Sequence, residues 1–76
     1  MKRNIYVGET ILFPGDRLTI LGISYIVKEI ENFYLKLTKL DDFYRPTSDC
    51  VIERYVVENG LKDHTIFYER DPEVRL

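Results

Sequence analysis

The sequence predicts a small all-β domain of five or six antiparallel strands that close into a barrel. Three observations support this class: apolar and polar residues alternate along several short segments, Gly and Pro separate these segments, and β-branched or aromatic residues are frequent within them. A chain of 76 residues has the size of one domain, so residues 1–76 are expected to share a single core.

The first segments predict two short strands and a tight turn. Residues 4–7 and 10–13 are apolar enough for short edge strands. Pro14 and Gly15 suit the central positions of a turn, and the side chain of Asp16 can bond to nearby backbone. We therefore expect the first hydrophobic segments to end at this turn.

Residues 17–30 predict two strands joined at Gly22, which can adopt a positive φ where the chain reverses. The alternation of the second strand is interrupted, because Ile30 falls out of register with the apolar residues before it. An extra residue near Lys28 and Glu29 would restore that register. The pattern therefore indicates a β-bulge there.

Residues 33–40 alternate cleanly, which predicts a third long strand in an antiparallel meander. A last strand is expected within residues 64–70, before a polar tail at 71–76. In the third long strand, the alternation places Phe33, Leu35 and Leu37 on one face and Tyr34, Lys36 and Thr38 on the other.

Residues 49–58 are compatible with a strand or a helix. Their β-branched residues favour a strand, and we take this as the main interpretation. Some of the apolar residues also follow helical spacing, with Ser48 or Asp49 as a cap and Gly60 as an end. The alternative is therefore an α+β domain with one short helix near residues 49–58.

The order "PGDRL…G…YIVKEI…FYLKL" resembles the opening of SH3-like small β-barrels, in which a turn ending in Gly-Asp leads into a bent meander. The resemblance covers about residues 8–40 and concerns the fold alone. The chain has no Trp and no ALYDY-like run, which the proline-peptide groove of SH3 domains would need. No functional residue is therefore transferred from that fold.

Charge and cysteine content exclude several classes of function. Thirteen acidic and eleven basic side chains give a net charge of −2, too weak a field to attract a phosphate backbone on its own. Cys50 is the only cysteine, so no intramolecular disulfide can form. No segment has the roughly 20 apolar residues of a membrane span. We expect a cytoplasmic protein that does not bind membranes.

The sequence gives no sign of catalysis or of a metal site, and we expect neither an enzyme nor a cofactor. Cys50 and His64 are the only candidate pair for nucleophilic catalysis. A hairpin turning at 59–60 would place them on the order of 16 Å apart, at about 3.3 Å per residue. Cys50 is expected to be a buried or half-buried structural residue. No spacing typical of zinc or calcium ligands is present.

The segment "DDFYRPTSD" is the main candidate for binding another protein. Phe43 and Tyr44 lie in a polar stretch beside Asp42 and Arg45, and aromatic residues and Arg are enriched at protein interfaces. A structural alternative is that Phe43 closes the end of the barrel while Tyr44 lies along its rim. We assign partner binding to Asp42, Phe43, Tyr44 and Arg45.

A second candidate is a surface for single-stranded nucleic acid. Small barrels bind single strands by stacking bases on aromatic side chains beside cations. Tyr34 and Lys36, with Lys28 beside them and Arg17 nearby, could form such a surface. A mixed, solvated sheet face is the structural alternative, because basic residues alternate with acidic ones along the chain.

These observations lead to the hypothesis of a non-enzymatic protein-binding module, inhibitory or regulatory in role. A phage-type protein that blocks a host defence system is a special case suggested by the small size. Single-stranded nucleic-acid binding is the alternative function. Self-association into a homo-oligomer is a further option, because a small domain with edge strands gains stability by pairing.

Overall fold

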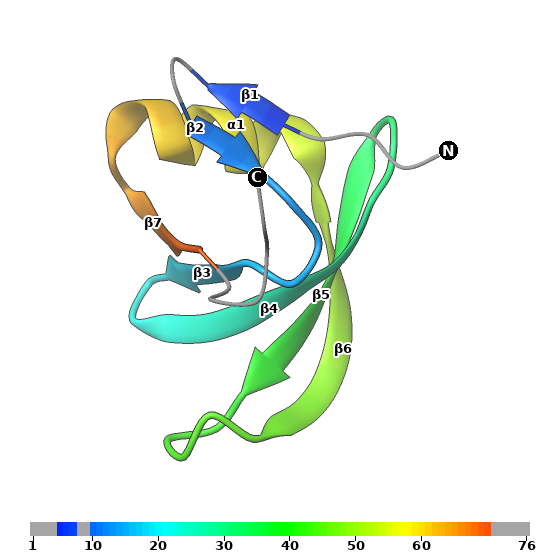
Figure 1. Ribbon diagram of the computed structural model, residues 1–76, viewed down its shortest axis with the longest axis vertical. Coiled ribbons are helices and arrows are strands. Elements are labelled where there is room, and N and C mark those ends of the chain that lie inside the picture. Colours follow the sequence, from blue (N-terminus) through cyan, green and yellow to red (C-terminus); the bar gives the residue numbers. More distant parts are fainter. Residues whose placement is uncertain (1–4, 8–9, 71–76) are drawn as a thin grey trace.

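The computed structural model describes residues 5–7 and 10–70, most of which form one antiparallel sheet beside one helix (Figure 1). The sheet has five strands in the order β6-β5-β4-β3-β7, and β1 and β2 form a separate pair. In chain order the elements are β1 (Ile5–Val7), β2 (Thr10–Leu12), β3 (Arg17–Ile20), β4 (Ile23–Ile30), β5 (Tyr34–Leu40), β6 (Pro46–Glu53), α1 (Arg54–Asp63) and β7 (Ile66–Glu69).

The five-stranded sheet is open. Within the described residues, β6 and β7 are its two edges, and each is paired on one side only. The small β-rich domain is therefore confirmed in its α+β form, and the closed barrel is not formed. The expected polar tail at 71–76 lies outside the described residues, and the resemblance to SH3-like barrels stays a prediction.

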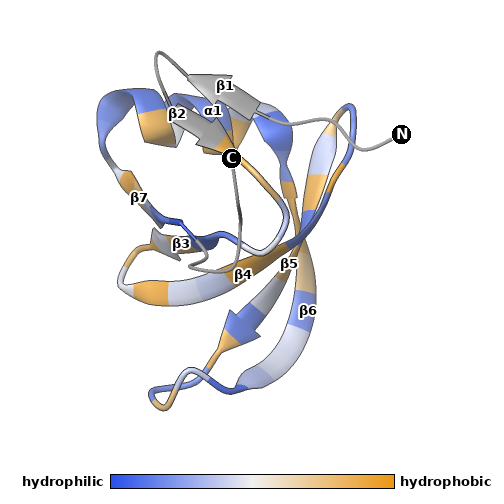
Figure 2. Cartoon of the chain, in the orientation of Figure 1, coloured by the Kyte–Doolittle hydropathy of each residue, from blue (hydrophilic) through white to orange (hydrophobic). Residues whose placement is uncertain are grey.

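The core lies between one face of the sheet and the helix. Leu35 and Leu37 fill the inner face of β5, as their alternation predicts. Figure 2 shows hydrophobic stretches on β4 and β5 where they pass beside the rest of the domain, whereas the far end of the β5–β6 hairpin is mostly pale or blue. The buried cluster consists of Leu12, Leu18, Val27, Ile30, Leu35, Leu37, Val57 and Ile66.

The predicted bulge in β4 is confirmed at Lys28. Val27 is paired with Leu37 and Glu29 with Lys36, so Lys28 has no residue opposite it. Because of this extra residue, Val27 and Ile30 are both buried although they are three positions apart. The bulge thus lets a single strand send side chains into the core on both sides of a bend.

The loops before β4 and before β5 each leave a large apolar side chain exposed. Gly22 has a φ of 79°, as predicted, and the preceding Leu21 also has a positive φ, of 52°, with its side chain 94% exposed. Phe33 was expected on the buried face of β5, and this is wrong. The Glu31 N–H donates to the Tyr34 carbonyl, so the chain turns at Phe33 and leaves its ring exposed.

The segment after β6 is helical, so the strand expected over residues 49–58 is correct only as far as Glu53. Val57 is completely buried from α1, and this contact with the core outweighs the β-propensity of the valines. The alternative placed the helix too early. The N-cap of the observed helix is Glu53, whose backbone is extended, and Gly60 lies inside the helix rather than at its end.

The helix ends at Asp63 because His64 adopts a left-handed conformation. His64 has a φ of 62°, and its N–H donates to the carbonyl of Gly60. The side chain of Thr65 also donates to that carbonyl, although its backbone N–H makes the shorter bond of 2.9 Å. This cap directs the chain into β7, which pairs with β3 and closes that side of the core.

The turn before β3 is built around Asp16, as predicted. Its side chain is completely buried, and its Oδ2 accepts a hydrogen bond of 2.9 Å from the Phe13 N–H. The same oxygen lies 3.4 Å from Nε of Arg70, which follows β7. The Asp16 carbonyl also accepts from the N–H of Val27 in β4. One residue thus joins the turn, β4 and the segment after β7.

We predict that Asp16→Ala lowers the free energy of unfolding by about 1–3 kcal/mol, because the Phe13 N–H loses its acceptor and the half-buried guanidinium of Arg70 loses a carboxylate partner. Asp16→Asn should cost less, since its amide oxygen can still accept from Phe13. Urea unfolding followed by circular dichroism measures both changes. Asp42→Ala, at an exposed position, is the control, and an equal loss from both alanine variants would contradict the prediction.

We predict that Gly60→Ala destabilises the domain although alanine is the better helix former. A Cβ at Gly60 would overlap Cγ1 and Cδ1 of Ile66. Such overpacking costs about 1–3 kcal/mol, against about 1 kcal/mol gained in helix propensity. In an Ile66→Ala background the same change should be neutral or stabilising, and equal destabilisation in both backgrounds would refute the overlap.

Candidate functional site

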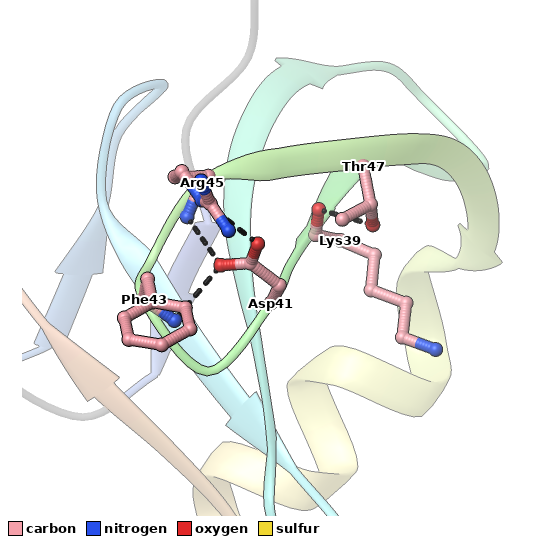
Figure 3. A network of polar contacts seen from close by, with 5 residues as sticks. All are labelled: Lys39, Asp41, Phe43, Arg45 and Thr47. Carbon is pink, nitrogen blue, oxygen red and sulfur yellow. Dashed lines mark hydrogen bonds and ion pairs between the residues drawn. The ribbon is translucent and has the colours of Figure 1, made fainter.

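Residues 41–45, here called the aromatic loop, connect β5 and β6 at the far end of their hairpin (Figure 1). Asp41 organises the loop from its first position (Figure 3). Its Oδ1 accepts from the N–H groups of Phe43 and Arg45, at 2.8 and 2.9 Å, and its Oδ2 lies 3.1 Å from Nε of Arg45. The Asp41 carboxylate therefore bonds to two backbone groups and one side chain of the loop.

Hydrogen bonds between backbone groups also hold the loop. The Tyr44 N–H donates to the Asp41 carbonyl, and the Asp41 N–H donates to the Arg45 carbonyl, each at 2.9 Å. Tyr44 has a φ of 61°, a conformation that costs a residue other than Gly on the order of 1–2 kcal/mol. Next to the loop, the Thr47 hydroxyl donates to the Lys39 carbonyl across the hairpin (Figure 3). These bonds hold the strained residue in place.

The two aromatic side chains of the loop are exposed. Phe43 is 76% exposed and Tyr44 60%, so Phe43 does not close one end of the core, and that alternative is wrong. Each ring lies beside a guanidinium group. The Cζ of Arg45 is 5.1 Å from the centre of the Phe43 ring, and the Cζ of Arg17 is 5.1 Å from that of Tyr44. Such cation–π contacts orient exposed rings.

Phe43, Tyr44, Arg45 and Asp42 thus share one small exposed surface, and their assignment to partner binding stays a prediction. A hollow of about 620 Å³ lies beside it, between the aromatic loop and the turn from β3 to β4. Tyr44 and Asp42 line this hollow on one side, and Gly22 and Ile23 on the other. The loop therefore stands next to a concave surface.

The residues proposed for nucleic acid share the outer face of the sheet, but each cation has a carboxylate partner. Lys28 Nζ lies 2.8 Å from Asp49 Oδ2, and Lys36 Nζ lies 3.8 Å from Glu29. Arg17 is paired with Glu69. These carboxylates oppose the approach of phosphate groups, so the ion pairs weigh against this surface as a backbone-binding site.

Asp49 is the centre of the polar contacts on that face. Its Oδ2 accepts from Lys28, and its Oδ1 accepts from the Thr38 hydroxyl at 2.9 Å. The bond from Lys28, followed by that from Thr38, lowers the pKa of Asp49 below its usual range. The same bond to Asp49 raises the pKa of Lys28. Both groups thus stay charged near neutral pH and face each other.

Cys50 is exposed, and the expectation of a buried cysteine is wrong. It lies opposite Leu37 on the side of the sheet that carries the core, but β6 is an edge strand and extends past that core. His64 caps α1, a different element. In the described part of the chain no three His, Cys, Asp or Glu residues gather as a metal site, and no helix could span a membrane.

Sequence reasoning missed another group of exposed apolar side chains. Tyr55 and Val56 project from the first turn of α1, and with Leu21 they line a shallow groove of about 320 Å³ beside the start of β7. The signal for Leu21 was available, because it lies directly before Gly22 in the connection between two strands, and such connections run over the protein surface. Tyr55 carried no such signal, since its exposure depends on the helix that forms there.

Comparisons with protein-family models, with curated proteins and with solved structures gave no significant match.

We predict that Asp41 titrates below the ordinary carboxyl value of 3.8. Its backbone bond from Arg45 is the main cause of the lowered pKa, and the bond from Phe43 and the guanidinium of Arg45 add to it. A lowered folded-state pKa stabilises the fold above pH 3.8, and this contribution is lost as the pH falls through the folded value. Carbon-13 NMR of the side-chain carboxyl gives the midpoint.

The amide signals of Phe43 and Arg45 should move with the same midpoint, because their hydrogens point at the titrating carboxylate. In Asp41→Asn that movement should disappear. A midpoint at or above 3.8, or amide shifts that persist in the Asn variant, would contradict the proposed role of Asp41.

Proposed function

We propose that this chain is a non-enzymatic protein-binding module that docks on a partner protein through the aromatic loop, in an inhibitory or regulatory role. The observation that carries the proposal is a pair of adjacent exposed rings, Phe43 and Tyr44, held in fixed positions by Asp41 and by two guanidinium groups. Binding that buries such exposed rings removes apolar surface from water, which favours the complex.

The residue types of the loop are those that contribute most to interfaces. Tyr and Arg are enriched at hot spots, and Phe is enriched in interface cores, because they supply large contact areas with few rotatable bonds. The carboxylate of Asp42 and the guanidinium of Arg45 would give directional, mixed-charge contacts at the rim. A partner with an apolar pocket and charges of both signs around it fits this surface.

Preorganisation supports the same proposal. Ordering a flexible loop on binding costs about 0.5–1.5 kcal/mol for each immobilised side chain. Here the rings of Phe43 and Tyr44 already stand against guanidinium groups and the backbone of residues 41–45 is fixed by Asp41, so part of that cost is removed before the partner arrives. An inhibitor that covers a functional surface of its target, such as a phage protein acting on a host defence system, is one form of this function.

Single-stranded nucleic acid is the weaker alternative, because Lys28, Lys36 and Arg17 are each paired with a carboxylate. The exposed thiol of Cys50 supports a reducing, cytoplasmic setting for the protein. A labelled single-stranded oligonucleotide discriminates between the two functions. A salt-dependent rise in its anisotropy that Lys36→Glu abolishes would favour the alternative.

We predict that a Phe43→Ser, Tyr44→Ser double variant captures at least about tenfold less of the partner from a lysate of the source cells, because hot-spot truncations cost about 2 kcal/mol or more. Phe67→Ser is the matched control, since Phe67 is 63% exposed on the other edge strand. Quantitative mass spectrometry of the captured proteins gives the ratio.

Circular dichroism must first show that both variants are folded. Proteins recovered equally by the wild type and the control, and depleted in the loop variant, support the proposal. Equal recovery by all three proteins would show that the aromatic loop is not the docking surface.

A further inference from the structure

The edge strand β6 is a long, open strand. It runs over Pro46–Glu53, pairs with β5 on one side, and has no strand on its other side within the described residues. Its residues are exposed on both faces of the sheet, with the exception of the half-buried Ile52. Figure 1 shows it running along the outer side of the hairpin that extends away from the helix. This edge can accept another strand.

Natural edge strands are usually protected by shortness, by Lys or Pro residues, or by bulges. The other edge, β7, has four residues. In β6, Pro46 and the irregularity opposite Lys39 and Leu40 protect only the beginning. No Lys or Arg occurs between Thr47 and Glu53. The carboxylate of Asp49 is turned back across the sheet toward Thr38 and Lys28, so it disfavours only a strand that places another acid directly opposite it.

The backbone groups that face the open side can be identified from the ladder. The Arg54 N–H donates to the Phe33 carbonyl, so these two residues form a hydrogen-bonded pair in line with the β5–β6 register. Such pairs alternate along an antiparallel ladder. The even-numbered residues of β6 therefore bond to β5, and Asp49, Val51 and Glu53 direct their N–H and C=O groups outward.

We propose that β6 pairs antiparallel with β6 of a second copy of this chain, with Cys50 facing Cys50 at the two-fold axis. An axis perpendicular to the sheet keeps every side chain on its own face, so facing residues are both even or both odd in number. This restriction, together with the charges of the strand, selects the register.

Two registers pair nearly all of β6 with β6 of the second copy and do not include the helix. Only one of these two registers places no two acidic side chains opposite each other. If Asp49 is the central pair, its carboxylate directly opposes that of the second copy, which is unfavourable. If Cys50 is the central pair, Asp49 faces Val51 and Glu53 faces Thr47. Centring on Val51 would place Asp49 opposite Glu53. Of these three registers, only the one centred on Cys50 places no two acidic side chains opposite each other.

The same register satisfies the outward backbone groups. Asp49 of one copy and Val51 of the other form hydrogen-bonded pairs on both sides of the axis, because both residues direct their groups outward. Cys50 then occupies a non-hydrogen-bonded pair, in which Cα atoms are about 4.5 Å apart. That separation lies within the range of about 4.4–6.8 Å that a disulfide can bridge, so the thiol reports the register directly.

The pairing joins two five-stranded sheets into one continuous sheet. Residues 41–45 precede the paired stretch in each copy, so both aromatic loops remain outside it. The inference goes beyond the protein-binding function proposed above and does not depend on it, because it uses the backbone of β6 rather than the aromatic side chains of the loop.

The first test is the oligomeric state of the reduced protein by sedimentation equilibrium over a range of concentrations. The wild type and Val51→Thr should show a monomer–dimer equilibrium. Val51→Pro, which removes one outward N–H without touching the β5 ladder, should be monomeric. Circular dichroism confirms that the proline variant is folded, and Cys50→Ser, which keeps every backbone group, should dimerise like the wild type.

The second test is disulfide formation with diamide, which takes up the two electrons and two protons released by the two thiols. The control is a Ser48→Cys, Cys50→Ser variant, with an exposed thiol on the same face. In the proposed register its two thiols are about 13 Å apart, at about 3.3 Å per residue. Cys50 should cross-link at least about tenfold faster, because pairing gives a millimolar effective concentration.

Dimerisation that Val51→Pro abolishes, together with fast cross-linking at Cys50 alone, supports the proposal. A monomer at all concentrations overturns it. A dimer that survives in folded Val51→Pro, or equal cross-linking rates at positions 48 and 50, also overturns it and assigns the contact to another surface, such as β7 or the aromatic loop.

Discussion

The carboxylate of Asp16 is completely buried, and it holds together three segments that are far apart in the sequence. It accepts from the Phe13 N–H, forms an ion pair with Arg70 after β7, and through its backbone is bonded to Val27 in β4. A buried charge is tolerated only where its partners are in place. The fold is therefore restricted to an arrangement in which β2, β4 and β7 meet at this turn.

This constraint extends to the aromatic loop. Arg17 directly follows Asp16, so the buried carboxylate fixes where β3 begins and where the guanidinium of Arg17 can reach. That guanidinium pairs with Glu69 and stands over the ring of Tyr44. The aromatic loop is thus positioned by two residues, by Asp41 within the hairpin and by Arg17 from β3.

Local signals predicted local structure well. Asp16 in its turn, the positive φ of Gly22, and the bulge near Lys28 all follow from constraints within a few residues. The helix was only an alternative, because the valines on either side of Glu53 have the same β-propensity. Whether they form strand or helix depends on Val57 reaching a core assembled from distant segments. The prediction that Phe33 and Cys50 are buried failed for the same reason. Whether these two residues are covered depends on where the core ends.

The separation of the aromatic loop from the core has a consequence for how such a protein can change. Residues 41–45 are held by bonds that Asp41 and the local backbone provide, whereas the buried cluster lies elsewhere in the sheet and helix. Substitutions at Asp42 or Phe43 therefore leave the stability of the domain nearly intact. The loop can therefore diversify in sequence while the scaffold stays constant, so that the surface it exposes can change without loss of the fold.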